Sequence, residues 1–374
     1  MQNAESDLLK LLSKSLFGCK SDVEMNDEIR AEARIQTVSA LVSSDEVQML
    51  AKNMLVTAAH ADLTKILQGI PFVTIKGFAS ASYYPNPLKR DMGDVDIFVD
   101  EKHYDEAIEA LRKNGFRETE GERNHERHVT FERGDVFFEV HHTLKGFPGD
   151  VAKERFHAEL KDAYASFFED LISTARRIGT QRGDVIIPDD YHHGVIMLMH
   201  VAGHLLESGG IGLRHLCDWA VYADKVPLDQ YRAELKALGL WRFACQLTAL
   251  STRYLGLRQM PWAGNWEDPF LEAFMEDIMK AGNFGVKNGG RILNVQMANA
   301  DRFYEPFIAK VKRKYQFCEK HGWLLPVGAV LYVFSYLGSQ IRRGRSINLS
   351  FVKEGRTRKA LYDQFGLYQF EDER

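Results

Sequence analysis

The stretch FVTIKGFASASYYPNPLKRDMGDVDIFVD, residues 72–100, constrains the fold of this chain more than any other. It predicts a short apolar strand, a Lys-Gly turn, a helix, a proline-containing loop and a second strand that begins with Asp94 and Asp96. Side chains two residues apart on a strand project from the same face. The two aspartates therefore repel each other unless a cation lies between them, and a divalent metal with oxygen ligands is the usual cation.

A third carboxylate is expected on a later strand. Residues 127–142 predict two short strands joined by Gly134-Asp135, a typical hairpin turn. In the second strand Glu139 and His141 share one face, while the intervening residues are apolar and predict a buried face. The polar face thus presents a carboxylate and an imidazole that can lie beside the aspartates.

Asp94, Asp96 and Glu139 together make an oxygen-donor set suited to Mg²⁺, or Mn²⁺ in its place. Metal ions held in this way lower the pKa of an attacking hydroxyl and neutralise charge on a phosphate. Two aspartates on one strand are too close to flank a sugar ring as opposed acid and base, which argues against glycoside hydrolysis. The Lys76-Gly77 turn before a helix offers a cation and backbone N–H groups to a triphosphate. These residues favour phosphoryl or nucleotidyl transfer.

The same residues resemble the polymerase-β nucleotidyltransferase superfamily. Within it, IKGFASASYYPNPLKRDMGDVDIFV and HVTFERGDVFFEVHHTL are similar to a bacterial branch described as uncharacterised nucleotidyltransferase. The resemblance is specific over residues 75–144 and weaker over the helical remainder, chiefly HVAGHLLESGGIGLRHLCDWAVYADK from His200. This chain departs from the usual pattern in two ways: Lys76 precedes the turn glycine, and 16 residues, more than is common, separate Gly77 from Asp94.

The resemblance implies an enzyme that moves a nucleoside monophosphate from an NTP, such as ATP, to a hydroxyl or phosphate acceptor and releases pyrophosphate. It implies metal binding by the three carboxylates, and a role for His141 in contacting or deprotonating the acceptor. The expected nucleotide-binding residues are Lys76, Gly77, Ser80 and Arg90. The acceptor is left open among a small molecule, a glycan, a protein and an RNA end. The alternative is a non-catalytic nucleotide-binding regulatory or scaffold protein of the same fold.

Length and periodicity predict an α+β protein of about two domains. A small mixed-sheet nucleotidyltransferase core is expected at residues 71–150, with N-terminal helices at 1–70 packing on it. A larger, mainly helical domain at 151–374 is expected to close the cleft and to supply the acceptor site.

Two pairs of residues in the helical part have the i, i+4 spacing that places side chains on one face. His200 and His204 have the spacing of zinc ligands, but Val201 stands where the HExxH motif has its glutamate. A packing pair, a zinc site of a metal-dependent hydrolase and a contact with substrate all remain open. Arg214 and Asp218 predict an ion pair within one helix, with an acceptor contact as the alternative. His204, Arg214 and Asp218 are therefore the candidate acceptor-side residues.

Composition limits the class of protein. The net charge is −4, which argues against a general nucleic-acid binder, so no stable DNA binding is expected. The four cysteines are scattered without a CxxC pair, and the N-terminus lacks the pattern of a signal peptide. Both features favour reduced thiols in the cytoplasm.

One apolar run, WLLPVGAVLYVFSYLG at residues 323–338, is the only membrane candidate in the sequence. It is 16 residues long and contains a proline, whereas about 20 residues are needed to span a bilayer. A buried helix is the favoured interpretation. The alternative is a peripheral membrane contact assisted by the basic residues that follow.

Overall fold

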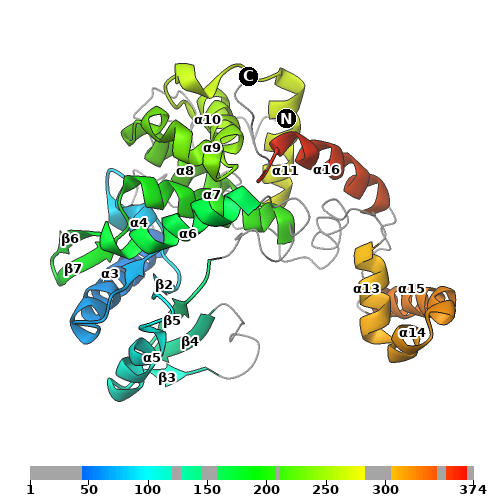
Figure 1. The fold of residues 1–374 in the computed structure, drawn as a ribbon, viewed down its shortest axis with the longest axis horizontal. Coiled ribbons are helices and arrows are strands. Elements are labelled where there is room, and N and C mark those ends of the chain that lie inside the picture. The colour runs from blue at the N-terminus through cyan, green and yellow to red at the C-terminus, as the bar shows by residue number, and fades with distance from the viewer. Residues whose placement is uncertain are drawn as a thin grey trace.

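The expected mixed sheet is present in the computed structural model, which describes residues 44–119, 128–144, 158–207, 210–282, 305–342 and 351–368 (Figure 1). Five strands have the spatial order β1-β2-β5-β4-β3. They are β1 Val73–Thr74, β2 Val95–Phe98, β3 Arg117–Glu118, β4 His128–Arg133 and β5 Val136–His141. Strand β2 is parallel to β5, and the other pairs are antiparallel. The predicted α+β class is confirmed.

The apolar face of β5 forms the core of this sheet. Val136, Phe138 and Val140 are buried, as their alternation with polar residues predicts. They belong to the same hydrophobic cluster as residues of α3 (Ser44–Ile66) and α5 (Tyr104–Lys113). Of the predicted N-terminal helices, α3 lies within the described residues, and residues 1–43 lie outside them.

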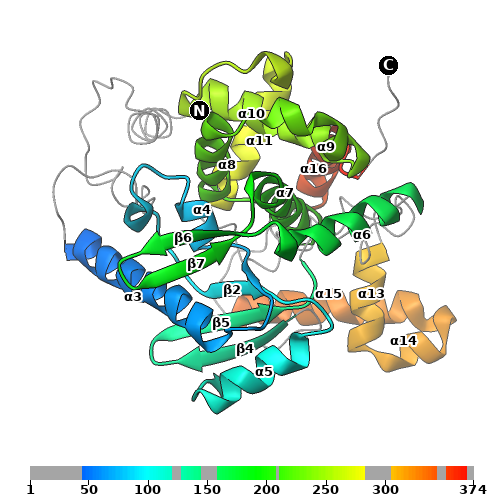
Figure 2. The same cartoon turned by 60° about the vertical axis from the view of Figure 1, so that its left-hand side comes forward.

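A second hydrophobic cluster fills the helical region, with Trp219, Tyr222, Phe243 and Phe274 among its fully buried side chains. Its helices are α6 Ala158–Ser173, α7 Asp190–Glu207, α8 Leu213–Lys225, α9 Arg232–Ala237, α10 Trp241–Leu255, α11 Asp268–Ala281 and α16 Phe351–Phe365. In both ribbon views α5 lies at the opposite end of the molecule from α8 and α10, with the sheet between them (Figure 2). Asp94 and Asp96, at the start of β2, line a cavity together with residues of α7 and α8.

A two-stranded hairpin, β6 (Arg176–Thr180) and β7 (Gly183–Ile187), interrupts the region expected to be helical. Strand β7 packs against α3 and β1. Val185 and Ile187 are fully buried in the cluster of the sheet, so this hairpin belongs to the core although it lies beyond residue 150. Its strands are five residues each, too short for the periodicity of the sequence to distinguish them from helix.

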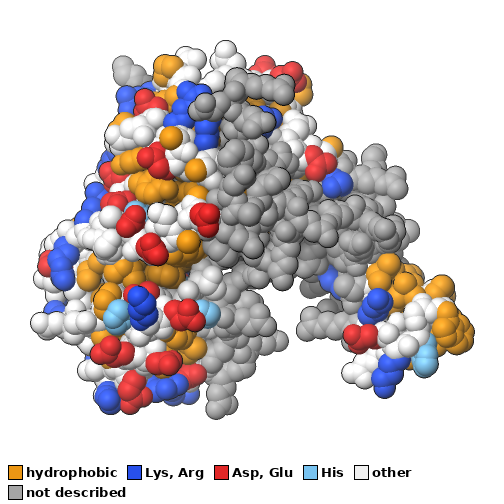
Figure 3. Space-filling model, in the orientation of Figure 1, with side chains coloured by type: hydrophobic (Ala, Val, Ile, Leu, Met, Phe, Trp, Pro, Cys, Tyr) orange, Lys and Arg blue, Asp and Glu red, His pale blue; other side chains and the backbone are white. Residues whose placement is uncertain are grey.

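Helices α13 (Glu305–Lys314), α14 (Gln316–Lys320) and α15 (Leu325–Arg342) form a separate lobe (Figure 1). The expectation that its apolar run is a buried helix is wrong. Trp323 is 78% exposed and Phe334 is 68% exposed, and the space-filling view shows apolar side chains at the surface of this lobe (Figure 3). Neither α15 nor any other described helix has the length and apolar character needed to cross a membrane. A peripheral membrane contact stays a prediction.

Candidate active site

The register of β2 and β5 brings the carboxylates together. Asp96 is the Cα partner of Glu139 in the parallel pair, so both side chains project from the same face of the sheet. Asp96 is buried and Glu139 is half-buried. Asp94 lies just before β2 and is exposed. All three line one cavity, and their joint binding of a metal stays a prediction.

His141 joins two of the carboxylates. Its ring is buried, and Nε2 lies 3.1 Å from Asp96 Oδ1 and 3.2 Å from Glu139 Oε2. The imidazole thereby fixes the distance between the two carboxylates. His141 is not among the residues that line the cavity, so its position favours holding Asp96 and Glu139 over touching an acceptor. The acceptor role stays a prediction.

Lys76 supplies a cation to the carboxylate set. Its Nζ lies 2.6 Å from Asp96 Oδ1. Burial alone would lower the pKa of Lys76, but the charges of Asp96, Glu139 and Asp94 outweigh it, and the pKa is raised. Burial would likewise raise the pKa of Asp96, but Lys76 and His141 hold it well below its usual range. Carboxylate oxygens are the ligands that Mg²⁺ prefers, so the donor set fits this ion, and its binding stays a prediction.

The carboxylates and residues of the helical region line one cavity of about 280 Å³, as a core wall and a helical wall. The core contributes Lys76, Gly77, Ser80, Arg90, Asp94, Asp96 and Glu139, and helices α7 and α8 contribute His200, His204, Arg214, His215 and Asp218. This volume is just below the range of about 300–1,000 Å³ that is typical of small-molecule sites. The cavity therefore joins the predicted nucleotide side to the predicted acceptor side.

Arg90 and Asp218 connect these two walls. Arg90 Nε and Nη2 donate to the two Asp218 carboxylate oxygens at 2.7 and 2.6 Å, and both side chains are buried. Tyr84 donates to the same carboxylate at 2.8 Å, and Arg90 Nη1 donates to the Gly77 carbonyl at 3.2 Å. This geometry favours a positioning role for Arg90, with Asp218 binding across the two regions rather than only along its own helix. Direct contact of Arg90 with phosphate stays a prediction.

The loop before the aspartates is anchored by a residue that the sequence did not single out. Asn53 of α3 is fully buried and donates through Nδ2 to the carbonyls of Leu88 and Arg90, at 2.7 and 3.0 Å. Its Oδ1 accepts from the Met92 N–H at 2.9 Å. A lone asparagine between Lys52 and Met54 of a helix gives no sequence signal of this contact, which spans more than 30 residues.

Gly77 and Ser80 lie at the turn into α4 (Phe78–Ala81), which is a single helical turn. Ser80 is buried, and its Oγ lies 3.4 Å from His193 Nε2. Gly77 has φ 53° and ψ −103°, a conformation that residues with a Cβ rarely adopt. The turn therefore requires glycine at position 77 for a backbone reason, in addition to any contact with phosphate.

Replacing Gly77 with alanine is expected to lower the free energy of unfolding by about 1–3 kcal/mol, because alanine is strained in this conformation. Gly93→Ala is the matched control: Gly93 lines the same cavity, and an added Cβ there meets nothing within 4 Å. Chemical denaturation of both variants measures the difference. Equal stability of the two variants would show that the turn relaxes without cost.

A further group of the cavity is a set of three histidines. His200 and His204 were expected on one face of α7, but His215 of α8, which lies beside them, was not singled out. His215 follows Arg214 in the first turn of α8. The three rings come together only because α8 packs on α7.

The family model described as uncharacterised nucleotidyltransferase matches residues 28–256. The chain belongs to this family. The match includes β1, β2 and β5 as well as α7 and α8, so both walls of the cavity lie within the family unit. No curated protein and no solved structure matches the chain.

Proposed function

We propose that this member of the family is a Mg²⁺-dependent nucleotidyltransferase that moves a nucleoside monophosphate from an NTP, such as ATP, to a hydroxyl or phosphate acceptor and releases pyrophosphate. The observation that carries the proposal is the pairing of Asp96 with Glu139 across β2 and β5, beside Lys76 and at the wall of a cavity. Family membership supports the general activity.

Each residue of the core wall has a role in this proposal. Asp94, Asp96 and Glu139 would hold the ion, which when bound would activate the acceptor and neutralise charge on the triphosphate. Lys76 would leave Asp96 for the triphosphate oxygens, since its ammonium is already charged and half-buried at the cavity wall. His141 would keep the carboxylates at a fixed separation.

The helical wall would receive the acceptor. His204 and Arg214 of α7 and α8 line the same cavity as the carboxylates, and both are half-buried. Arg90 and Asp218 would hold the two walls in register. Cys217, Cys245 and Cys318 are buried thiols that form no disulfide among the described residues, which supports a cytoplasmic location.

A non-catalytic nucleotide-binding protein of the same fold is the second candidate. Clustered carboxylates oppose it, because a protein that does not bind metal gains nothing from placing Asp94, Asp96 and Glu139 on one wall against their mutual repulsion.

The test is a screen of the full chain with labelled NTPs and candidate acceptors, read as pyrophosphate release with Mg²⁺ and with EDTA. Release that requires Mg²⁺ and is lost in the Asp94→Asn/Asp96→Asn double variant is expected. Turnover that is unchanged in this double variant would remove the carboxylates from the reaction and contradict the proposal.

A further inference from the structure

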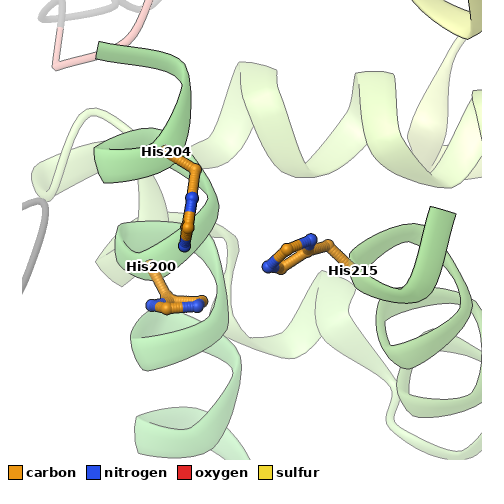
Figure 4. Close-up of side chains that lie close together, drawn as sticks. All are labelled: His200, His204 and His215. Carbon is orange, nitrogen blue, oxygen red and sulfur yellow. The ribbon is translucent and has the colours of Figure 1, made fainter. Parts of the chain in front are cut away.

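His200, His204 and His215 converge on the helical wall of the cavity (Figure 4). One nitrogen of each ring lies within 4.8 Å of one nitrogen of each of the others. The ring centroids are 4.6 Å apart for His200–His204, 5.0 Å for His204–His215 and 5.5 Å for His200–His215. All three side chains are half-buried, so the cluster is accessible from the cavity.

We propose that these three histidines form a second metal site, for a divalent ion of the zinc class, distinct from the carboxylate site on the core wall. Three imidazoles suit zinc, cobalt, nickel and copper, whereas Mg²⁺ prefers oxygen ligands. The i, i+4 pair on α7 with a third ligand from α8 gives three protein ligands and leaves one coordination position open. That position would face the cavity and accept water or a donor atom of a bound molecule.

One contact must change when the ion binds. The Gly212 N–H donates to His215 Nδ1 at 3.1 Å, which places the ring proton on Nε2. Figure 4 shows the far side of the His215 ring, which carries Nε2, directed toward α7. Coordination through Nε2 moves the proton to Nδ1 and exchanges this neutral hydrogen bond for a metal–nitrogen bond. The site thus predicts a change of His215 tautomer on metal binding.

A second group capable of holding a metal, formed by His128, Glu139 and His141, must be separated from this one in the test. It belongs to the carboxylate wall, because His141 and Glu139 are bound to each other and His141 is bound to Asp96. Glu139→Gln removes a ligand of that group and leaves the three histidines unchanged. The variant therefore distinguishes the two walls.

The experiment titrates the metal-free full chain with Co²⁺ and follows its visible absorption, with Zn²⁺ as the competitor. One equivalent is expected to give the absorption of nitrogen-ligated Co²⁺, which Zn²⁺ displaces. His204→Gln is expected to weaken binding at least about 100-fold, since loss of even an outer partner of a metal ligand costs 10–100-fold. Glu139→Gln is expected to keep this nitrogen-ligated absorption and its displacement by Zn²⁺, because the three histidines are unchanged.

His200→Gln repeats the measurement at the other ligand of α7, with circular dichroism as the check of folding for each variant. Nitrogen NMR of the histidine rings is expected to show His215 changing from the Nε2–H to the Nδ1–H tautomer when Zn²⁺ binds. Absence of stoichiometric binding, binding that survives loss of either α7 histidine, or binding lost in Glu139→Gln would overturn the proposal. None of these readouts depends on NTP turnover, so the failure of this site and of the proposed function are distinguishable.

Discussion

Asp96→Asn is expected to lower Mg²⁺-dependent pyrophosphate release by at least about 1000-fold, which corresponds to about 4 kcal/mol of transition-state stabilisation. Asp96 has the central position among the carboxylates, because it is buried and pairs in register with Glu139. It also contacts both Lys76 and His141. An asparagine keeps the size of the side chain but removes the charge that a divalent ion requires. Initial rates at saturating NTP measure the loss.

Asp105→Asn is the control for this substitution. Asp105 is an exposed residue in the first turn of α5 and does not line the cavity, so its loss is expected to leave the rate unchanged. Thermal unfolding of both variants separates a catalytic loss from a folding loss. If Asp96→Asn keeps its rate within tenfold of the wild type while remaining folded, the role of this carboxylate in metal binding is excluded.

Asp218→Asn is expected to lower the free energy of unfolding by about 3–5 kcal/mol, because it leaves the buried guanidinium of Arg90 without its anion. Asp224→Asn on the same helix is the matched control. Asp224 pairs with Arg258 at the surface, where the side chains are 38% and 68% exposed, and such a pair contributes at most about 1 kcal/mol. Chemical denaturation of both variants compares the two losses.

The same pair predicts how stability depends on pH. Burial would raise the pKa of Asp218, but Arg90 outweighs burial and the pKa lies below its ordinary value of 3.8. A carboxyl group whose pKa is lower in the folded than in the unfolded protein stabilises the fold at pH values above its unfolded-state pKa. This stabilisation is lost as pH falls through the pKa of the folded state. The difference between wild type and Asp218→Asn is therefore expected to be constant near neutrality and to shrink below about pH 4. A difference that grows on acidification would contradict the ion pair.

Short-range periodicity was sufficient to predict the buried apolar face of β5. The alternation in residues 136–141 fixed which face of β5 is buried, and the spacing of Asp94 and Asp96 placed two carboxylates at the entrance of β2. A local pattern carries this information because successive side chains of a strand point to opposite faces of the sheet. The sequence predicted only that the two strands could lie side by side. Their parallel pairing, and the register that sets Asp96 opposite Glu139, are seen in the structure alone.

Contacts between distant segments were not predictable in the same way. Arg90 and Asp218 are 128 residues apart, and nothing within either segment indicates the other. His215 joins His200 and His204 only because α8 packs on α7. The apolar run at α15 shows the reverse case: its composition favours burial, but the lobe of α13–α15 leaves Trp323 and Phe334 exposed, since burial depends on what packs against a helix.

The most direct test of the account is calorimetric titration of the full chain with an NTP analogue whose α–β bridge cannot be cleaved, in Mg²⁺ and in EDTA. The carboxylate wall predicts binding that is at least about tenfold tighter with Mg²⁺, because Asp94, Asp96 and Glu139 repel a triphosphate unless a divalent ion lies between them. Asp96→Asn is expected to abolish this difference. Equally tight binding in EDTA and in Mg²⁺ would contradict the account and would favour a nucleotide-binding protein that does not catalyse transfer.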